Sequence, residues 1–173
     1  MTFSVTQYGK PLSETKYKWD EETRTFSTKE DDLVLDFSDY SNVSFVTGYS
    51  CTFKTGPCCT FKTGNYCTFT TWSDCTFTTG SSCTFTTGSC CIFTTGHYCT
   101  FTTEYSCTFT TQDSCTFNVY HCCEFAVGKE CSITRRDVFE VIIPDPDKKI
   151  KLREFEIKGF YTEEELMIKE IIE

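Results

Sequence analysis

Apolar residues recur along the middle of the chain at a fixed interval of eight. From Cys51 onward, a cysteine stands two residues before each aromatic position, and this column continues to Cys131. An unbroken short repeat of this kind is typical of a solenoid, in which every repeat packs on its neighbours. The aromatic column consists of Phe37, Phe45, Phe53, Phe61, Phe69, Phe77, Phe85, Phe93, Phe101, Phe109, Phe117 and Phe125.

Residues 35–138 divide into thirteen octads, and CTFTTG followed by two variable residues is the typical one. The first five residues of an octad alternate and are β-branched or aromatic, which predicts a short strand. Glycine commonly fills the sixth position and polar residues fill the last two, which predicts a turn. Each octad is therefore expected to form one strand and one corner.

Alternation along a strand assigns the two faces. If the phenylalanine points inward, the cysteine before it and the threonine two residues after it also point inward, and the second and fourth positions face water. The opposite assignment buries Lys54 and Lys62 and exposes the whole phenylalanine column, so we reject it.

The period of the variable positions sets the size of a coil. Cys58, Cys90 and Cys122 share the eighth position and lie 32 residues apart, and Tyr66 and Tyr98 repeat that separation. Thirty-two residues equal two coils of 16 but not a whole number of coils of 24. We therefore predict an all-β solenoid with two octads per 16-residue coil, about 30 Å long, with phenylalanine and cysteine ladders inside.

The flanks are expected to cap the open strand edges of this rod. Residues 1–34 contain Trp19 and the acidic run 20–22, which suggests a hairpin and an acidic loop. Residues 139–173 form the predicted C-terminal cap. An apolar strand over 138–143 leads into this cap, and a second strand over 149–157 is possible. The capping box Thr162 and Glu165 predicts a short closing helix after it.

Charge is distributed unevenly and excludes several functions. The net charge is −9, yet only five charged residues lie between Cys51 and Cys122, so both flanks are acidic around a neutral middle. Nucleic-acid binding needs a basic stripe, and an anionic membrane repels acidic ends. No signal peptide and no apolar run of about 20 residues is visible. We therefore expect no nucleic-acid or membrane partner, an intracellular location and reduced thiols.

Chemistry-bearing residues form no recognisable active site. The inward cysteines should lie opposite threonines rather than opposite other cysteines, so packing explains them better than metal binding. His97 and His121 fall on octads of opposite parity, and the sequence has no C-x-x-C pair. The vicinal pairs at 58–59, 90–91 and 122–123 start at corners about 9–10 Å apart, beyond disulfide reach. We expect no enzyme, no cofactor and no metal.

Outward threonines form the most distinctive predicted surface. The candidate binding face consists of Thr68, Thr70, Thr84, Thr86, Thr100 and Thr102. Their flat, uncharged pattern resembles the Thr-x-Thr surface of β-solenoid ice-binding proteins. The alternative is that threonine is simply a good strand residue, whose neutrality avoids stacking like charges about 4.8 Å apart.

The motif CTFKTG at 51–56 and 59–64 resembles uncharacterised octapeptide-repeat proteins of giant DNA viruses, some phages and environmental sequences. The stretches 19–26 and 135–142 are similar to the opening and closing segments of that family. The resemblance implies a viral or virus-derived solenoid in an infected cell or a virion, and it supplies no site residues. Six consecutive octads depart from the family by carrying threonine in place of the usual lysine at the fourth position.

The sequence therefore predicts a structural or interaction protein that presents a flat face to a protein partner or to another copy of itself. Ice binding through the threonine rows is the alternative. A redox or metal-binding thiol protein is the third possibility.

Overall fold

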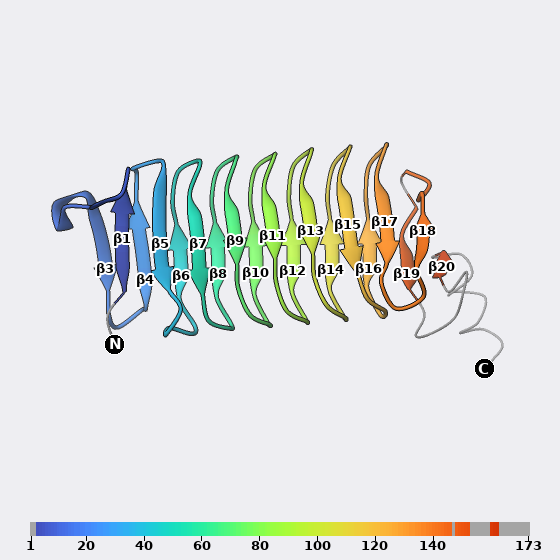
Figure 1. The fold of residues 1–173 in the computed structure, drawn as a ribbon, viewed down its shortest axis with the longest axis horizontal. Helices are drawn as coiled ribbons and strands as arrows, with labels where there is room; N and C mark the ends of the chain where they lie inside the picture. The colour runs from blue at the N-terminus through green and yellow to red at the C-terminus, as the bar shows by residue number, and fades with distance from the viewer. Residues whose placement is uncertain (1–2, 147, 153–159, 163–173) are drawn as a thin grey trace.

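The computed structural model describes residues 3–146, 148–152 and 160–162. Over these residues the chain is all-β and winds into a rod with two sheets as its walls (Figure 1). Helical structure within them is limited to one 3-10 turn, η1 (Glu14–Lys16). The predicted β-solenoid class is confirmed.

Successive octads alternate between the two sheets, so every coil contributes one strand to each. The first sheet runs, in spatial order, through β18 (Glu140–Ile142), β17 (Ser132–Arg135), β15 (Thr116–Val119), β13 (Thr100–Thr102), β11 (Thr84–Thr86), β9 (Thr68–Thr70), β7 (Thr52–Thr55), β5 (Leu33–Phe37), β1 (Ser4–Gln7) and β2 (Lys10–Pro11). The second runs through β20 (Phe160–Thr162), β19 (Ile150–Leu152), β16 (Glu124–Ala126), β14 (Thr108–Thr110), β12 (Ile92–Thr94), β10 (Thr76–Thr78), β8 (Thr60–Lys62), β6 (Ser44–Val46), β4 (Thr25–Thr28) and β3 (Tyr17–Asp20).

The parallel register confirms the 16-residue coil. Phe85 of β11 pairs with Phe69 of β9 on one side and with Phe101 of β13 on the other. Parallel pairing begins earlier than residue 35, because β4 already places Phe26 beside Phe45 of β6. The first strand of the coil stack therefore lies inside the segment 1–34 that the sequence assigned to the cap.

The core is a double column of phenylalanine rings. Within the first sheet, the Phe85 ring stacks on that of Phe101 with centroids 4.8 Å apart and planes 3° apart. Across to the second sheet, Phe85 meets Phe77 and Phe93 edge to face, with centroids 5.2 Å apart in both cases. Phe85 is fully buried. Stacked and edge-to-face pairs are both favourable arrangements for aromatic rings.

Successive coils are almost untwisted relative to one another. Neighbouring strands in a sheet normally rotate by about 20–25°, whereas the strands of successive coils run nearly parallel along this rod (Figure 1). The planes of stacked rings in the middle of the core differ by only 3° or 4°. Flat sheets of many strands are unusual and are typically held by stacking side chains. The aromatic column therefore keeps both walls of the solenoid flat.

Each corner depends on one residue in the left-handed conformation, at the eighth position of the octad. The φ angle is 60° at Cys58 and 58° at Tyr98, for example. The residues that share this position and a positive φ are Asn42, Ser50, Cys58, Tyr66, Asp74, Ser82, Cys90, Tyr98, Ser106, Ser114, Cys122 and Glu130. The sixth-position glycines do not adopt a positive φ, so the turn is made two residues later.

The sixth-position glycines instead allow adjacent coils to approach closely. A Cβ added to Gly88 would lie 2.5 Å from Oγ of Ser73 and 3.0 Å from its backbone nitrogen. In the same corner, the N–H of Ser89 donates to Oγ of Ser73 at 3.1 Å. A side chain of one coil thus caps the backbone of the next, and glycine leaves room for that contact.

Antiparallel strands cover both ends of the rod. At the N-terminal end, β1 pairs with β5 and the β3–β4 hairpin pairs Trp19 with Phe26, as the sequence suggested. The ring of Phe3 stacks on Phe37 with centroids 4.3 Å apart and closes the core there. At the other end, β18 pairs with β17 and β19 pairs with β16. These pairings cover the parallel edges that otherwise recruit other chains.

A buried ion pair ends the core at the C-terminal side. Arg135 is fully buried at the position that threonine occupies in a typical octad, and its Nη2 lies 2.7 Å from Oδ2 of Asp137. Glu140 contributes a second carboxylate, 3.6 Å from Nη1. The closing helix predicted after Thr162 lies outside the described residues, as does most of the strand predicted over 149–157 beyond Leu152.

Candidate binding face

The outer face of the first sheet carries two straight rows of side chains. Strands β9, β11 and β13 align residue for residue, so Thr84 lies between Thr68 and Thr100. Thr86 lies in the same way between Thr70 and Thr102. All six predicted face residues thus lie on one wall, in the predicted rows.

The six side chains point away from the core. Five are exposed and Thr102 is half-buried. Their hydroxyls make no hydrogen bond to any other residue that the structure describes. Within a strand the two threonines stand about 6.7 Å apart, and between strands the rows repeat at about 4.8 Å. The result is a regular array of hydroxyl and methyl groups that water or a partner can reach.

The face extends further than the sequence prediction. Thr52 of β7 and Thr116 of β15 continue the first row by one coil at each end. In the second row, Lys54 and Asn118 take the corresponding places. Neither threonine is part of a Thr-x-Thr pair. Both occupy the outward second position of their octads, and that position is the sequence signal that identifies them.

Charge begins only at the ends of the first face. Nζ of Lys54 lies 3.9 Å from Oδ2 of Asp36, its neighbour in the second row on the N-terminal side. Between Lys54 and the C-terminal cap, both rows contain uncharged residues only. A partner of this wall would therefore meet a neutral surface.

The second sheet presents a less regular outer face. Lys62 of β8 interrupts one row, and Ile92 of β12 interrupts the other with a half-exposed apolar side chain. Near the C-terminal end, Glu124 receives a hydrogen bond of 2.6 Å from Nζ of Lys151. The two walls share one fold, so the second serves as an internal comparison for the first.

The cysteine column is buried beside the phenylalanine rings. All fourteen cysteines are free. Six inward cysteines lie beside a threonine of the preceding octad, as predicted, and Cys99 beside Thr95 is one example. Valine takes that place before Cys123 and Cys131. Sγ of Cys99 also approaches the carbonyl oxygens of Gly80 and His97 at 3.6 Å and 3.5 Å. These thiols therefore behave as small apolar side chains with local acceptors.

The pKa is raised at eight of the eleven buried thiols. It is lowered at Cys51 and Cys99, chiefly by side-chain hydrogen bonds with Cys67 and Cys115. Hydrogen bonding with Cys107, followed by burial, raises the pKa of Cys91 to about 11. Hydrogen bonding with Cys123 and burial raise the pKa of Cys107 to about 12. Burial also raises the pKa of the Cys131 thiol. Because the thiolate is the reactive and metal-binding form, the raised pKa disfavours reaction at those eight thiols.

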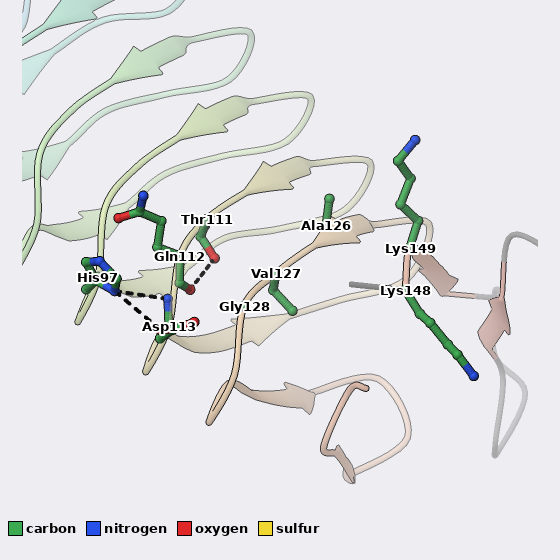
Figure 2. A pocket seen from close by; sticks show the side chains of 9 residues that line it. All are labelled: His97, Thr111, Gln112, Asp113, Ala126, Val127, Gly128, Lys148 and Lys149. Atoms are coloured by element: carbon green, nitrogen blue, oxygen red, sulfur yellow. Dashed lines mark hydrogen bonds and ion pairs between the residues drawn. The ribbon is translucent and has the colours of Figure 1, made fainter. Parts of the chain in front are cut away.

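A hollow of about 440 Å³ beside the second sheet brings polar side chains together (Figure 2). The backbone N–H of Asp113 donates to Nδ1 of His97 at 3.2 Å. In Figure 2 the side chains of Lys148 and Lys149 extend away from that pair. His97 therefore caps a neighbouring coil, as Ser81 caps His97 itself at 3.1 Å.

Among the described residues, no group of three His, Cys, Asp or Glu side chains is placed to hold a metal ion. None of the helical structure in them has the length and apolar character that crossing a bilayer requires. Comparison of the chain with protein-family models, curated proteins and solved structures yields no match.

Proposed function

We propose that the protein is a non-enzymatic structural solenoid that uses the outer face of its first sheet to bind a flat protein surface, in the simplest case that of a second copy. The observation that carries this proposal is the untwisted, uncharged pair of threonine rows. Large rigid hydroxyl–methyl surfaces lose little conformational freedom on binding, because threonine has a stiff side chain.

The size of the face sets the expected affinity. Seven parallel strands from β5 to β17, at about 4.8 Å each, span roughly 34 Å, and a wall five residues wide spans about 16 Å. Two such faces bury about 1,100 Å² together, which falls at the low end of specific interfaces. We therefore expect weak, reversible association. The charges in the rows of this span are limited to Lys54 and Asp36, which pair with each other, so ionic strength should affect the association little.

Matched lysine variants test this proposal. Thr70→Lys with Thr86→Lys places two ammonium groups in adjacent strands of the first face. Thr78→Lys with Thr94→Lys does the same on the second face. In sedimentation equilibrium, the wild type and the second-face variant should associate reversibly, and the first-face variant should remain monomeric. A wild type that is monomeric throughout removes the second copy as partner, and equal loss in both variants removes the first face as the site.

Ice is the second candidate ligand, and the in-register Thr-x-Thr array favours it. Spacings of about 6.7 Å and 4.8 Å offer a repeating set of hydroxyl and methyl groups to ordered water. Thermal hysteresis and ice-shaping measurements distinguish the two proposals. Activity that disappears in the first-face lysine variant and persists in the second-face variant supports ice binding, while no activity at high micromolar concentration excludes it.

A further inference from the structure

Three cysteines occupy equivalent places on one corner of the rod. Cys58, Cys90 and Cys122 each end an octad where the chain passes from the first sheet to the second, with φ angles of 60°, 58° and 57°. Cys58 and Cys90 are exposed and Cys122 is half-buried, whereas the other eleven cysteines are buried. Solvent therefore reaches three thiols with the same backbone geometry.

Cys122 differs from the other two in having an imidazole beside its sulfur. Nδ1 of His121 lies 3.3 Å from Sγ of Cys122. The ring of His121 stacks on that of Tyr105, with centroids 5.7 Å apart and planes 6° apart. Its backbone oxygen also accepts the N–H of Ser106 at 3.3 Å. The imidazole is thus held against the thiol by the preceding coil.

A lysine lies on the strand that pairs with the one after Cys122. Lys151 of β19 pairs with Glu124 of β16, and its Nζ donates to the Glu124 carboxylate at 2.6 Å. Reactive cysteines occupy partly exposed sites near histidine side chains, because such groups accept the thiol proton. Cys122 is partly exposed and has His121 beside it.

The equivalent cysteines have no histidine before them in the sequence. Cys58 follows Pro57. Cys90 follows Ser89, whose hydroxyl donates to a carboxylate oxygen of Glu104 at 3.0 Å. The chain therefore contains two natural controls for the environment of Cys122.

We propose that Cys122, with His121 as its proton acceptor, is a nucleophilic thiol that exchanges with small-molecule disulfides. The Cys122 thiol transfers its proton to Nδ1 of His121, and the resulting thiolate attacks one sulfur of the disulfide. The disulfide S–S bond breaks as a mixed disulfide forms at Cys122. The other half of the reagent leaves as a thiolate and takes up the proton from His121. No further oxidant is needed.

The native protein labelled with dithiodipyridine, a neutral disulfide, tests the proposal. Peptide mapping of samples quenched with acid gives separate rates for the three corner thiols. At about pH 7, Cys122 should react about tenfold faster than Cys58 and Cys90, which is less than the roughly 10²–10⁴-fold that a positioned general base contributes in an enzyme.

Two histidine variants separate proton transfer from structural support. In His121→Asn, the side-chain amide retains a hydrogen-bond acceptor but not a basic nitrogen, so Cys122 should slow to the rate of Cys90. His97→Asn is the matched control and should leave the Cys122 rate unchanged. Asparagine fits at this position, because Asn65 caps the N–H of Ser81 at the equivalent place in an earlier coil. Equal rates at the three wild-type thiols overturn the proposal, and so does an unchanged rate in His121→Asn. The wild-type comparison remains decisive if that variant fails to fold.

Discussion

Truncation of a central ring, Phe85→Ala, tests whether the aromatic column holds the coils together. The ring is fully buried between Phe69 and Phe101 in its own sheet and meets two rings of the other sheet edge to face. A phenylalanine buries about 150–250 Å², which at about 25 cal/mol per Å² corresponds to about 4–6 kcal/mol. The alanine methyl retains part of that contribution. We expect the free energy of unfolding to fall by about 3–5 kcal/mol.

Denaturant titration followed by far-UV circular dichroism, under reducing conditions, measures this loss. Thr86→Ala is the matched control, because Thr86 is the next residue of the same strand but points into solvent. An exposed substitution of this kind should change stability by no more than about 0.5 kcal/mol. Similar losses for the two variants would mean that the inward and outward faces are assigned incorrectly, and the account of the binding face would fail with them.

Three further changes test the coil and its corners. Deleting residues 83–98, which is one coil, should preserve cooperative thermal unfolding, because each coil contacts only its neighbours. Deleting residues 83–94 should abolish cooperative unfolding, because every later phenylalanine then moves out of register. Gly88→Ala should lower stability by about 1–3 kcal/mol, since its Cβ would meet Ser73; no loss in denaturant titration would contradict the close approach of the coils. Ser106→Gly should raise stability by about 0.5–1 kcal/mol because φ is 57° there, and a loss in the same titration would show that the corner is not strained.

The sequence was sufficient to predict the coil and its faces because two simple periods coincide. Alternation along the strand places Cys83, Phe85 and Thr87 on one side, and the 32-residue spacing of Cys58 and Cys90 selects two octads per coil. All three inward positions are buried in the structure. Few local preferences compete with either pattern, since most of the strand residues are β-branched or aromatic.

The corners could not be predicted in the same way. Tyr98, Cys90 and Glu130 all adopt a positive φ although none of them favours it, because closure of the coil imposes the conformation. Glycine at the sixth position predicted a turn there, because glycine is common in turns. In the structure, the missing side chain of glycine instead leaves room for residues of the neighbouring coil. The sequence did not predict the start of the stack at Phe26. Phe26 lies 11 positions before Phe37 instead of the regular eight, and no cysteine stands two residues before it.

The candidate face shows the same division between local pattern and assembled structure. The octad period predicts the two rows of threonines. It does not predict that the face is flat, because β-sheets ordinarily twist. Here parallel stacking of rings such as Phe85 and Phe101, 3° apart, favours coils that do not rotate. The chemistry of the core thus determines the shape of the surface. Leucine fills space but does not stack in planes. Replacing central phenylalanines with leucine should therefore restore the twist between coils. It should also weaken the binding of any ligand that contacts both rows at once, even though no surface residue changes.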